Sequence, residues 1–189
     1  GLDYFMDKRQ TVGFLFNGGF SKSRFESFSH TTISLPNSTV IDRILKSSNI
    51  DISPFNNTTY NINYKYQVKD GLEINVDGDA GIFDRKSEAN QPNFYLNPTE
   101  DSTLYSNIYK YSSPTQVNLK SLKADASHPL FGGQLGLGIK IANIKTDNNF
   151  IFNNIIDGLP VLDIERSNHF DYLERIGTSY LNYAWTMKN

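Results

Sequence analysis

The chain has 189 residues, a formal net charge of −2 and no cysteine. This length is sufficient for one domain with a sizeable core, and the charge, without a run of Lys or Arg, gives no reason to expect a nucleic-acid partner. The lack of cysteine excludes disulfides, thiol nucleophiles and thiolate metal sites. No apolar stretch predicts a transmembrane helix, and residues 1–3 do not resemble the start of a signal peptide. Transmembrane β-strands escape that hydropathy test, because only every second residue of such a strand is apolar.

Two extended segments open the chain. Residues 2–5 predict the end of a strand, and residues 7–10 predict a short polar turn. A second strand begins near Thr11 and continues towards His30, which is longer than the usual ~5–6 residues of a strand in a globular protein. One face of its first half carries Val12, Phe14, Phe16, Gly18 and Phe20.

Residues 31–57 lose this alternation, and we expect them to form a long polar loop. Pro36, Pro54 and many Ser and Asn residues interrupt the pattern. Residues 40–45 are mostly apolar and follow residues that favour helix caps. They predict either a short capped helix or an ordered loop with one apolar anchor.

The clearest pattern in the chain predicts a long hairpin over residues 58–82. Apolar and polar residues alternate in its first arm, and the alternation returns in its second arm. Lys69, Asp70 and Gly71 separate the arms, and Asp-Gly is a strong signal for a tight hairpin turn. One face is expected to carry Tyr60, Ile62, Tyr64, Tyr66, Val68, Leu72, Ile74, Val76, Ala80 and Ile82. The other face is expected to carry Asn61, Asn63, Lys65, Gln67, Glu73, Asn75, Asp77 and Asp79.

The rest of the chain predicts further strands separated by polar segments. We expect a second long loop at residues 85–113, a strand at 116–126 and a turn at 128–133. A strand at 135–152, a third long loop at 153–168 and a last strand at 170–185 are expected to follow.

The expected connections alternate between short turns and long loops. A transmembrane up-and-down barrel explains this alternation, because tight turns face the periplasm and long loops face outwards. The strand lengths agree, since ~9–11 tilted residues cross the hydrocarbon core. A soluble all-β protein is the alternative. In a barrel, interfacial aromatic girdles are expected from Tyr4, Tyr66, Phe83, Phe131, Phe150, Phe170 and Trp185.

Five segments carry a family resemblance, and in order they read GLDYFMDKRQTVGFLFNGGF, YNINYKYQVKDGLEINVDGDAG, QPNFYLNP, FGGQLGLGIKIANIKTDNNF and LDIERSNHFDYLERIGTSYLNY. Together they resemble the barrel region of Bacteroidetes outer-membrane β-barrel proteins of the TonB-dependent receptor type. The resemblance implies an all-β, antiparallel up-and-down meander of about seven long strands, forming part of a barrel wall. Such receptors are much longer and carry an N-terminal plug. We therefore expect residues 1–189 to be one segment of the barrel, without plug or signal peptide.

No set of residues predicts catalysis, a cofactor or a bound metal ion. Asn75, Asp77 and Asp79 have the spacing that opens an EF-hand loop. However, Ala80 occupies the glycine position of that loop, and Lys86 occupies the position of the bidentate glutamate. We therefore expect three polar residues on one face of a strand, and no enzyme. Metal-ligand spacing is also lacking between His30, His128 and His169.

Two functions from different classes fit the sequence. The first is a non-enzymatic part of an outer-membrane receptor or transporter that binds or takes up an extracellular ligand. The second is a soluble or surface-anchored all-β module that binds glycan or protein. The expected partners are outer-membrane lipid, the remainder of the barrel and, through two unpaired strand edges, further copies of the chain. The candidate ligand-binding residues are aromatic residues of the expected long loops, namely Phe94, Tyr95, Tyr105, Tyr109 and Tyr111.

Overall fold

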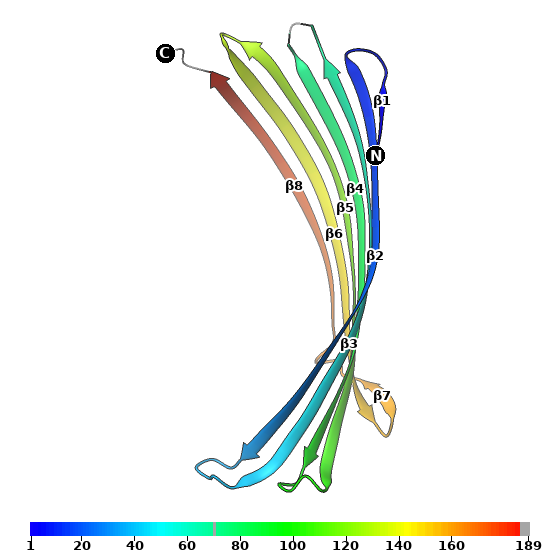
Figure 1. Ribbon diagram of the computed structural model, residues 1–189, viewed down its shortest axis with the longest axis vertical. Helices are drawn as coiled ribbons and strands as arrows, with labels where there is room; N and C mark the ends of the chain where they lie inside the picture. The colour runs from blue at the N-terminus through cyan, green and yellow to red at the C-terminus, as the bar shows by residue number, and fades with distance from the viewer. Residues whose placement is uncertain (70, 186–189) are drawn as a thin grey trace.

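The computed structural model describes residues 1–69 and 71–185, which form one antiparallel sheet of eight strands (Figure 1). Each strand from β1 to β6 pairs with the next one along the chain. β7 and β8 pair with successive parts of one edge of β6. The expected all-β meander is confirmed. The strands are β1 (Leu2–Phe5), β2 (Gln10–Ser34), β3 (Ile41–Gln67), β4 (Glu73–Leu96), β5 (Thr103–Leu130), β6 (Gly133–Ile156), β7 (Leu159–Leu162) and β8 (Asn168–Trp185).

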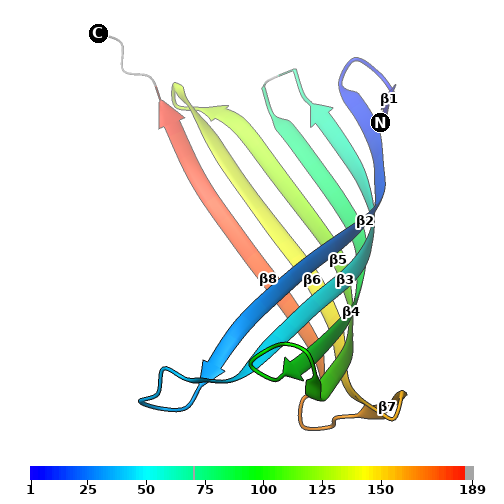
Figure 2. The same ribbon diagram turned by 60° about the horizontal axis from the view of Figure 1, so that its bottom comes forward.

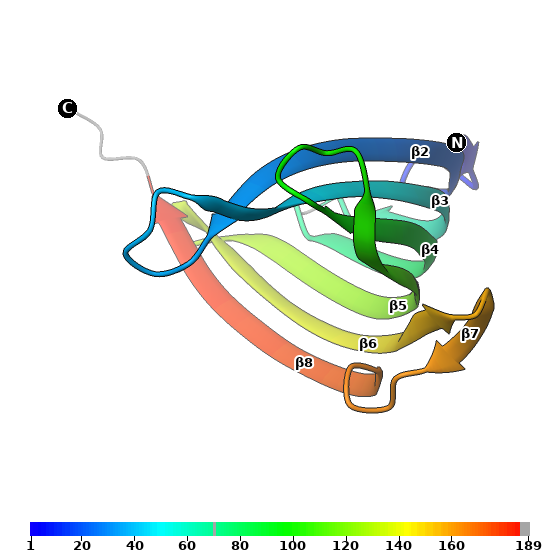
Figure 3. The same ribbon diagram turned by 90° about the horizontal axis from the view of Figure 1, so that it is seen from below.

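The sheet is strongly curved and open. Viewed obliquely and from below, the strands follow a C-shaped path from β2 to β8 (Figures 2 and 3). β1 pairs with β2 only over residues 11–14. Within the described residues, β8 has no partner other than β6. The sheet therefore has the form of a barrel wall with two free edges. None of the described residues belongs to a helix that is long and apolar enough to cross a membrane.

The prediction of a long loop over residues 31–57 is wrong. β2 runs to Ser34 and β3 begins at Ile41, so the connection covers only residues 35–40. Residues 41–45 are the first part of β3 rather than a helix or an anchored loop. The two strands pair along almost their whole length.

The second and third expected loops are also largely strand. Only residues 97–102 connect β4 to β5, and the expected third loop contains the end of β6 and all of β7. At the opposite end of the sheet, residues 6–9 and 131–132 form tight turns. Asp70, from the turn expected between β3 and β4, lies outside the described residues. Connection lengths therefore differ much less between the two ends than the sequence suggested.

These strand segments lack the alternation that marks a strand because neither of their faces is apolar. Residues 21–34 of β2, for example, carry Ser, Lys, Arg, Glu or His on both faces. A period of two is visible in a sequence only where the two faces meet different surroundings. Strand ends that are polar on both faces are expected where a sheet projects into water.

The hairpin expected over residues 58–82 is confirmed. Tyr60 lies opposite Ala80, and Tyr66 lies opposite Ile74, so the apolar residues of the two arms share one face. Asn61 lies opposite Asp79 on the other face. The register continues without a shift through this half of the sheet, so the same two faces extend across β5, β6 and β8.

Exposure identifies which face is convex. In β6, the apolar Leu137, Ile139 and Ile141 are exposed, whereas Gly138 and Ile144 on the other face are more covered. Side chains spread apart on the convex side of a curved sheet and crowd together on the concave side. The apolar face is therefore convex, and the polar face of the hairpin is concave.

The convex apolar surface forms a band next to the tight turns. Beyond the band, the same face is mostly polar on every long strand, although β3 also carries Ile44, Ile50 and Ile52 there. Each stretch is about nine residues long, close to the ~9–11 residues that a tilted strand needs to cross hydrocarbon. The stretches are residues 12–20, 60–68, 74–82, 122–130, 133–141 and 177–185.

The turn between β5 and β6 has an unusual residue choice. Phe131 and Gly132 have φ angles of 48° and 78°. Positive φ at both central residues defines the tight turn that suits a hairpin, and it favours Asn, Asp or Gly at the first position. Asp157 and Gly158 follow this preference in the turn between β6 and β7, with φ of 50° and 78°. Phe131 does not, and its side chain is 91% exposed.

Candidate functional site

Polar side chains connect neighbouring strands on the concave face at the level of the apolar band. The carboxylate of Asp79 in β4 accepts hydrogen bonds from Asn61 of β3 at 2.7 Å and from Ser121 of β5 at 2.8 Å. Nearer the tight turn, Glu73 is contacted by the side chains of Gln67, Asn75 and Lys65 at 2.7, 3.0 and 3.0 Å. Polar groups that satisfy one another in this way suit the interior of a barrel.

An aromatic cluster occupies the concave face further from the tight turns. It consists of Tyr109 and Tyr111 on β5 and Phe150 and Phe152 on β6. The ring centroids of Tyr109 and Phe152 are 5.3 Å apart, and those of Tyr111 and Phe150 are 5.9 Å apart. These distances lie in the favourable range for aromatic pairs. Register explains the proximity, since Tyr111 lies opposite Phe152.

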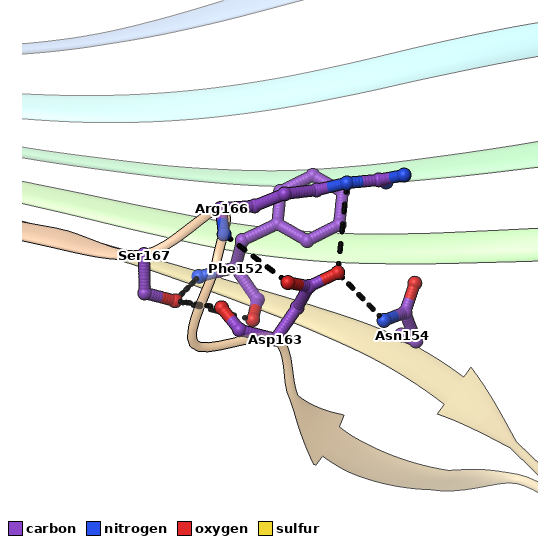
Figure 4. A network of polar contacts seen from close by, with 5 residues as sticks. All are labelled: Phe152, Asn154, Asp163, Arg166 and Ser167. Atoms are coloured by element: carbon purple, nitrogen blue, oxygen red, sulfur yellow. Dashed lines mark hydrogen bonds and ion pairs between the residues drawn. The ribbon is translucent and has the colours of Figure 1, made fainter.

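Arg166, in the turn that precedes β8, covers part of the aromatic cluster. Its guanidinium carbon lies 5.1 Å from the ring centroid of Phe152 and 5.5 Å from that of Tyr109. Both distances suit a cation–π interaction. Figure 4 shows the Arg166 side chain beside the Phe152 ring.

The turn that carries Arg166 is fixed to β6 by Asp163 and Ser167 (Figure 4). The Asp163 carboxylate accepts hydrogen bonds from Asn154 Nδ2 and from the backbone N–H of Arg166, both at 3.1 Å. The backbone N–H of Phe152 donates to Ser167 Oγ at 3.0 Å. The pKa of Asp163 lies below its usual range, mainly because Asn154 donates a hydrogen bond to the carboxylate. The backbone N–H and the positive charge of Arg166 lower this pKa further, although desolvation opposes them. The carboxylate is therefore ionised at neutral pH.

A second aromatic pair lies nearer the outer connections. Tyr95 and Tyr105 stack with ring centroids 4.3 Å apart. Between this pair and the aromatic cluster, Asn93 is only 7% exposed and accepts a hydrogen bond from Ser47 at 2.6 Å. The hydroxyl of Tyr111 donates to Asn49 at 3.4 Å. Aromatic rings and neutral hydrogen-bonding groups thus alternate across β3, β4 and β5.

The structure places four of the five aromatic residues expected to bind ligand on one face of the sheet, in two separate groups. Tyr95, Tyr105, Tyr109 and Tyr111 all lie on the concave face, whereas Phe94 lies on the convex face. Their expected location in loops is wrong, because all five belong to β4 or β5. Four further residues of the site were not expected from the sequence, namely Phe150, Phe152, Asn93 and Arg166. Phe150, Ile151 and Phe152 form a continuous apolar run, so alternation does not single out the two phenylalanines, and no local signal connects Arg166 to them.

The polar groups do not form a metal centre. Asn75, Asp77 and Asp79 lie on one strand face, as the sequence predicted. Among residues 1–69 and 71–185, no group of three or more His, Asp or Glu side chains is arranged to hold a metal ion.

Comparison with known proteins identifies the type of barrel wall. Residues 65–189, about two thirds of the chain, match the profile of the Outer membrane protein beta-barrel family. The chain belongs to this family. No curated protein matches the sequence at a significant level. As a member of the Outer membrane protein beta-barrel family, the protein lies in the outer membrane, and its convex apolar band contacts lipid. This location overturns the alternative of a soluble module.

Proposed function

We propose that this chain forms part of the wall of a TonB-dependent receptor of the Bacteroidetes type, and that its aromatic cluster contacts an extracellular ligand before uptake. The observation that supports the proposal most is the placement of the aromatic cluster and Arg166 on the concave face, beyond the apolar band. In outer-membrane barrels the tight turns face the periplasm. The aromatic cluster therefore faces the outer end of the lumen, where an incoming ligand arrives.

The chemistry of the surface favours an oligosaccharide as ligand. Flat aromatic rings contact the apolar faces of sugar rings, and amide and hydroxyl groups bind their hydroxyl edges. Asn154 lies opposite Tyr109 in the register, and Asn49 accepts a hydrogen bond from Tyr111. The charge of Arg166 is balanced by Asp163, whose Oδ2 lies 3.5 Å from Nε. The surface is thus predominantly neutral.

Binding is tested with an array of neutral and acidic oligosaccharides and the protein in detergent micelles. Phe152→Ala removes a ring of the aromatic cluster, and we expect about tenfold weaker binding of the best array ligand. Phe94→Ala is the matched control, because it removes the same ring from the convex face of β4, which pairs with β5 of the aromatic cluster. Equal affinities of the two variants would contradict a role for the aromatic cluster.

Uptake is tested in cells that carry the protein, with the best array ligand in fluorescent form. A receptor of the TonB-dependent type needs the proton-motive force, so a protonophore is expected to abolish uptake. Uptake that continues with the protonophore would indicate a passive pore and would contradict the TonB-dependent assignment, whatever the array result.

A further inference from the structure

A groove on the convex face lies at the outer boundary of the apolar band. It crosses β5, β6 and β8 and has a volume of about 510 Å³. Its convex-face lining comprises Lys120, Leu122, Ile141, Asn143, Arg175 and Gly177. The groove belongs to the opposite face from the aromatic cluster, so the proposed ligand contacts do not use it.

The groove has an apolar floor and a cationic rim because two rows of the sheet meet there. Leu122, Ile141 and Gly177 occupy one row of the register, which is the last row of the band. A Cβ added to Gly177 would meet no atom within 4 Å, so the floor is hollow at this position. Lys120 and Arg175 occupy the next row outwards, on either side of Asn143.

The two cations have no acidic partner. Among the described residues, neither Lys120 nor Arg175 lies within 4.0 Å of a carboxylate, whereas Lys145 in the following row is paired with Asp171 at 3.2 Å. Two strand spacings separate the two backbones, roughly 10 Å. Both side chains are therefore available to an anion placed between them.

We propose that this groove binds the phosphorylated headgroup of an outer-leaflet lipid of the lipid A type. The tight turns face the periplasm, so this boundary of the band lies at the outer leaflet. Acyl chains fit the floor formed by Leu122, Ile141 and Gly177, and the phosphate lies between Lys120 and Arg175. Guanidinium and ammonium groups form charge-assisted hydrogen bonds with phosphate. Such basic sites at a membrane boundary select anionic lipids.

The test measures retention of bisphosphorylated lipid A by the protein in dodecyl maltoside micelles, using native mass spectrometry. Lys120→Gln combined with Arg175→Gln removes the cations and leaves the floor intact. Each cation at a membrane surface contributes about fivefold, so we expect on the order of 25-fold weaker retention by the double variant. Lys120→Arg combined with Arg175→Lys preserves the charge and is expected to retain the lipid.

The matched control is Lys86→Gln combined with Lys110→Gln, which removes two cations from the same convex face further from the band. This control is expected to retain lipid A within about twofold of the unmodified chain. Lipid A stripped of its phosphates is expected to bind weakly, and millimolar inorganic phosphate is expected not to displace the intact lipid.

Three results would overturn the proposal. They are equal retention by the groove variant and the unmodified chain, equal losses in the groove variant and the control, and displacement of the lipid by free phosphate. A native β-sheet circular dichroism spectrum for each variant shows that a loss reflects the site rather than the fold. Uptake assays do not enter this test, so its outcome is separate from that of the proposed transport function.

Discussion

A charge on the convex face is expected to destabilise the protein far more than the same charge on the concave face. Ile62 and Asn63 are adjacent in β3, at nearly equal depth, but on opposite faces. Ile62 is 58% exposed on the convex band. It lies two residues inside the outer boundary at Tyr60, which corresponds to roughly 5 Å of depth for a strand tilted by about 45°.

The cost follows from this depth. Arg on the lipid face costs ~2–4 kcal/mol at the midplane and ~0–1 kcal/mol near the interface. Ile62→Arg lies between these limits, so we expect a loss of about 2 kcal/mol in the free energy of unfolding. Asn63→Arg places its guanidinium opposite Asp77, on the concave side. We expect its cost to stay within about 1 kcal/mol, because the carboxylate compensates the new charge.

The assay is guanidinium unfolding of the protein in phosphatidylcholine vesicles, followed by fluorescence of Trp185, the single tryptophan. Trp185 lies at the opposite end of the band from Tyr60, so neither substitution touches the reporter. Equal destabilisation by the two variants would refute the assignment of the convex face to lipid. A larger loss for Asn63→Arg would reverse the assignment of the faces.

Three further predictions follow from the connections and edges. Phe131→Asn relieves the strain of a bulky residue at positive φ and is expected to stabilise the protein by about 1 kcal/mol in detergent. Unchanged unfolding midpoints in guanidinium would contradict this. Hydrogen bonds from Lys46 at 2.5 Å and His30 at 2.8 Å lower the pKa of Glu100. The stabilisation is therefore complete above the ordinary carboxyl pKa and is lost as pH falls through the lowered folded value. The melting-temperature difference from Glu100→Gln should be constant at neutral pH and shrink in acid; a constant difference throughout would show that the ion pairs contribute nothing. Finally, the free edges of the sheet predict self-association, and exclusively monomeric protein after crosslinking in detergent would rule it out.

The sequence was most informative where the two faces of a strand meet different surroundings. Residues 60–68 alternate cleanly because one face contacts lipid and the other faces the lumen. The same strand shows no clean alternation of apolar and polar residues over residues 41–57, where both of its faces contact water. For this reason the expected number of strands, about seven, is close to the eight of the structure, but the strands are longer than the sequence predicted.

The candidate site was only partly predictable, because it depends on pairing across strands. Once β4 is recognised as a continuous strand, alternation alone separates Phe94 from Tyr95. The contact of Arg166 with Tyr109 instead requires the register of β5 and β6 and the path of the turn before β8. Residues so far apart in the sequence carry no local pattern that links them.

The extension of the sheet beyond the band has a consequence for the proposed contact between the aromatic cluster and a ligand. Tyr111 and Leu122 share β5 and are about eleven residues apart, which places the aromatic cluster roughly 25 Å outside the lipid boundary along a tilted strand. There the rings are held by paired backbone rather than by mobile loops. Little conformational entropy is then lost when a ligand binds, because the contact surface is already ordered. Under the proposed function, this rigidity would favour rapid binding of ligands that match the surface over adaptation to many different ones.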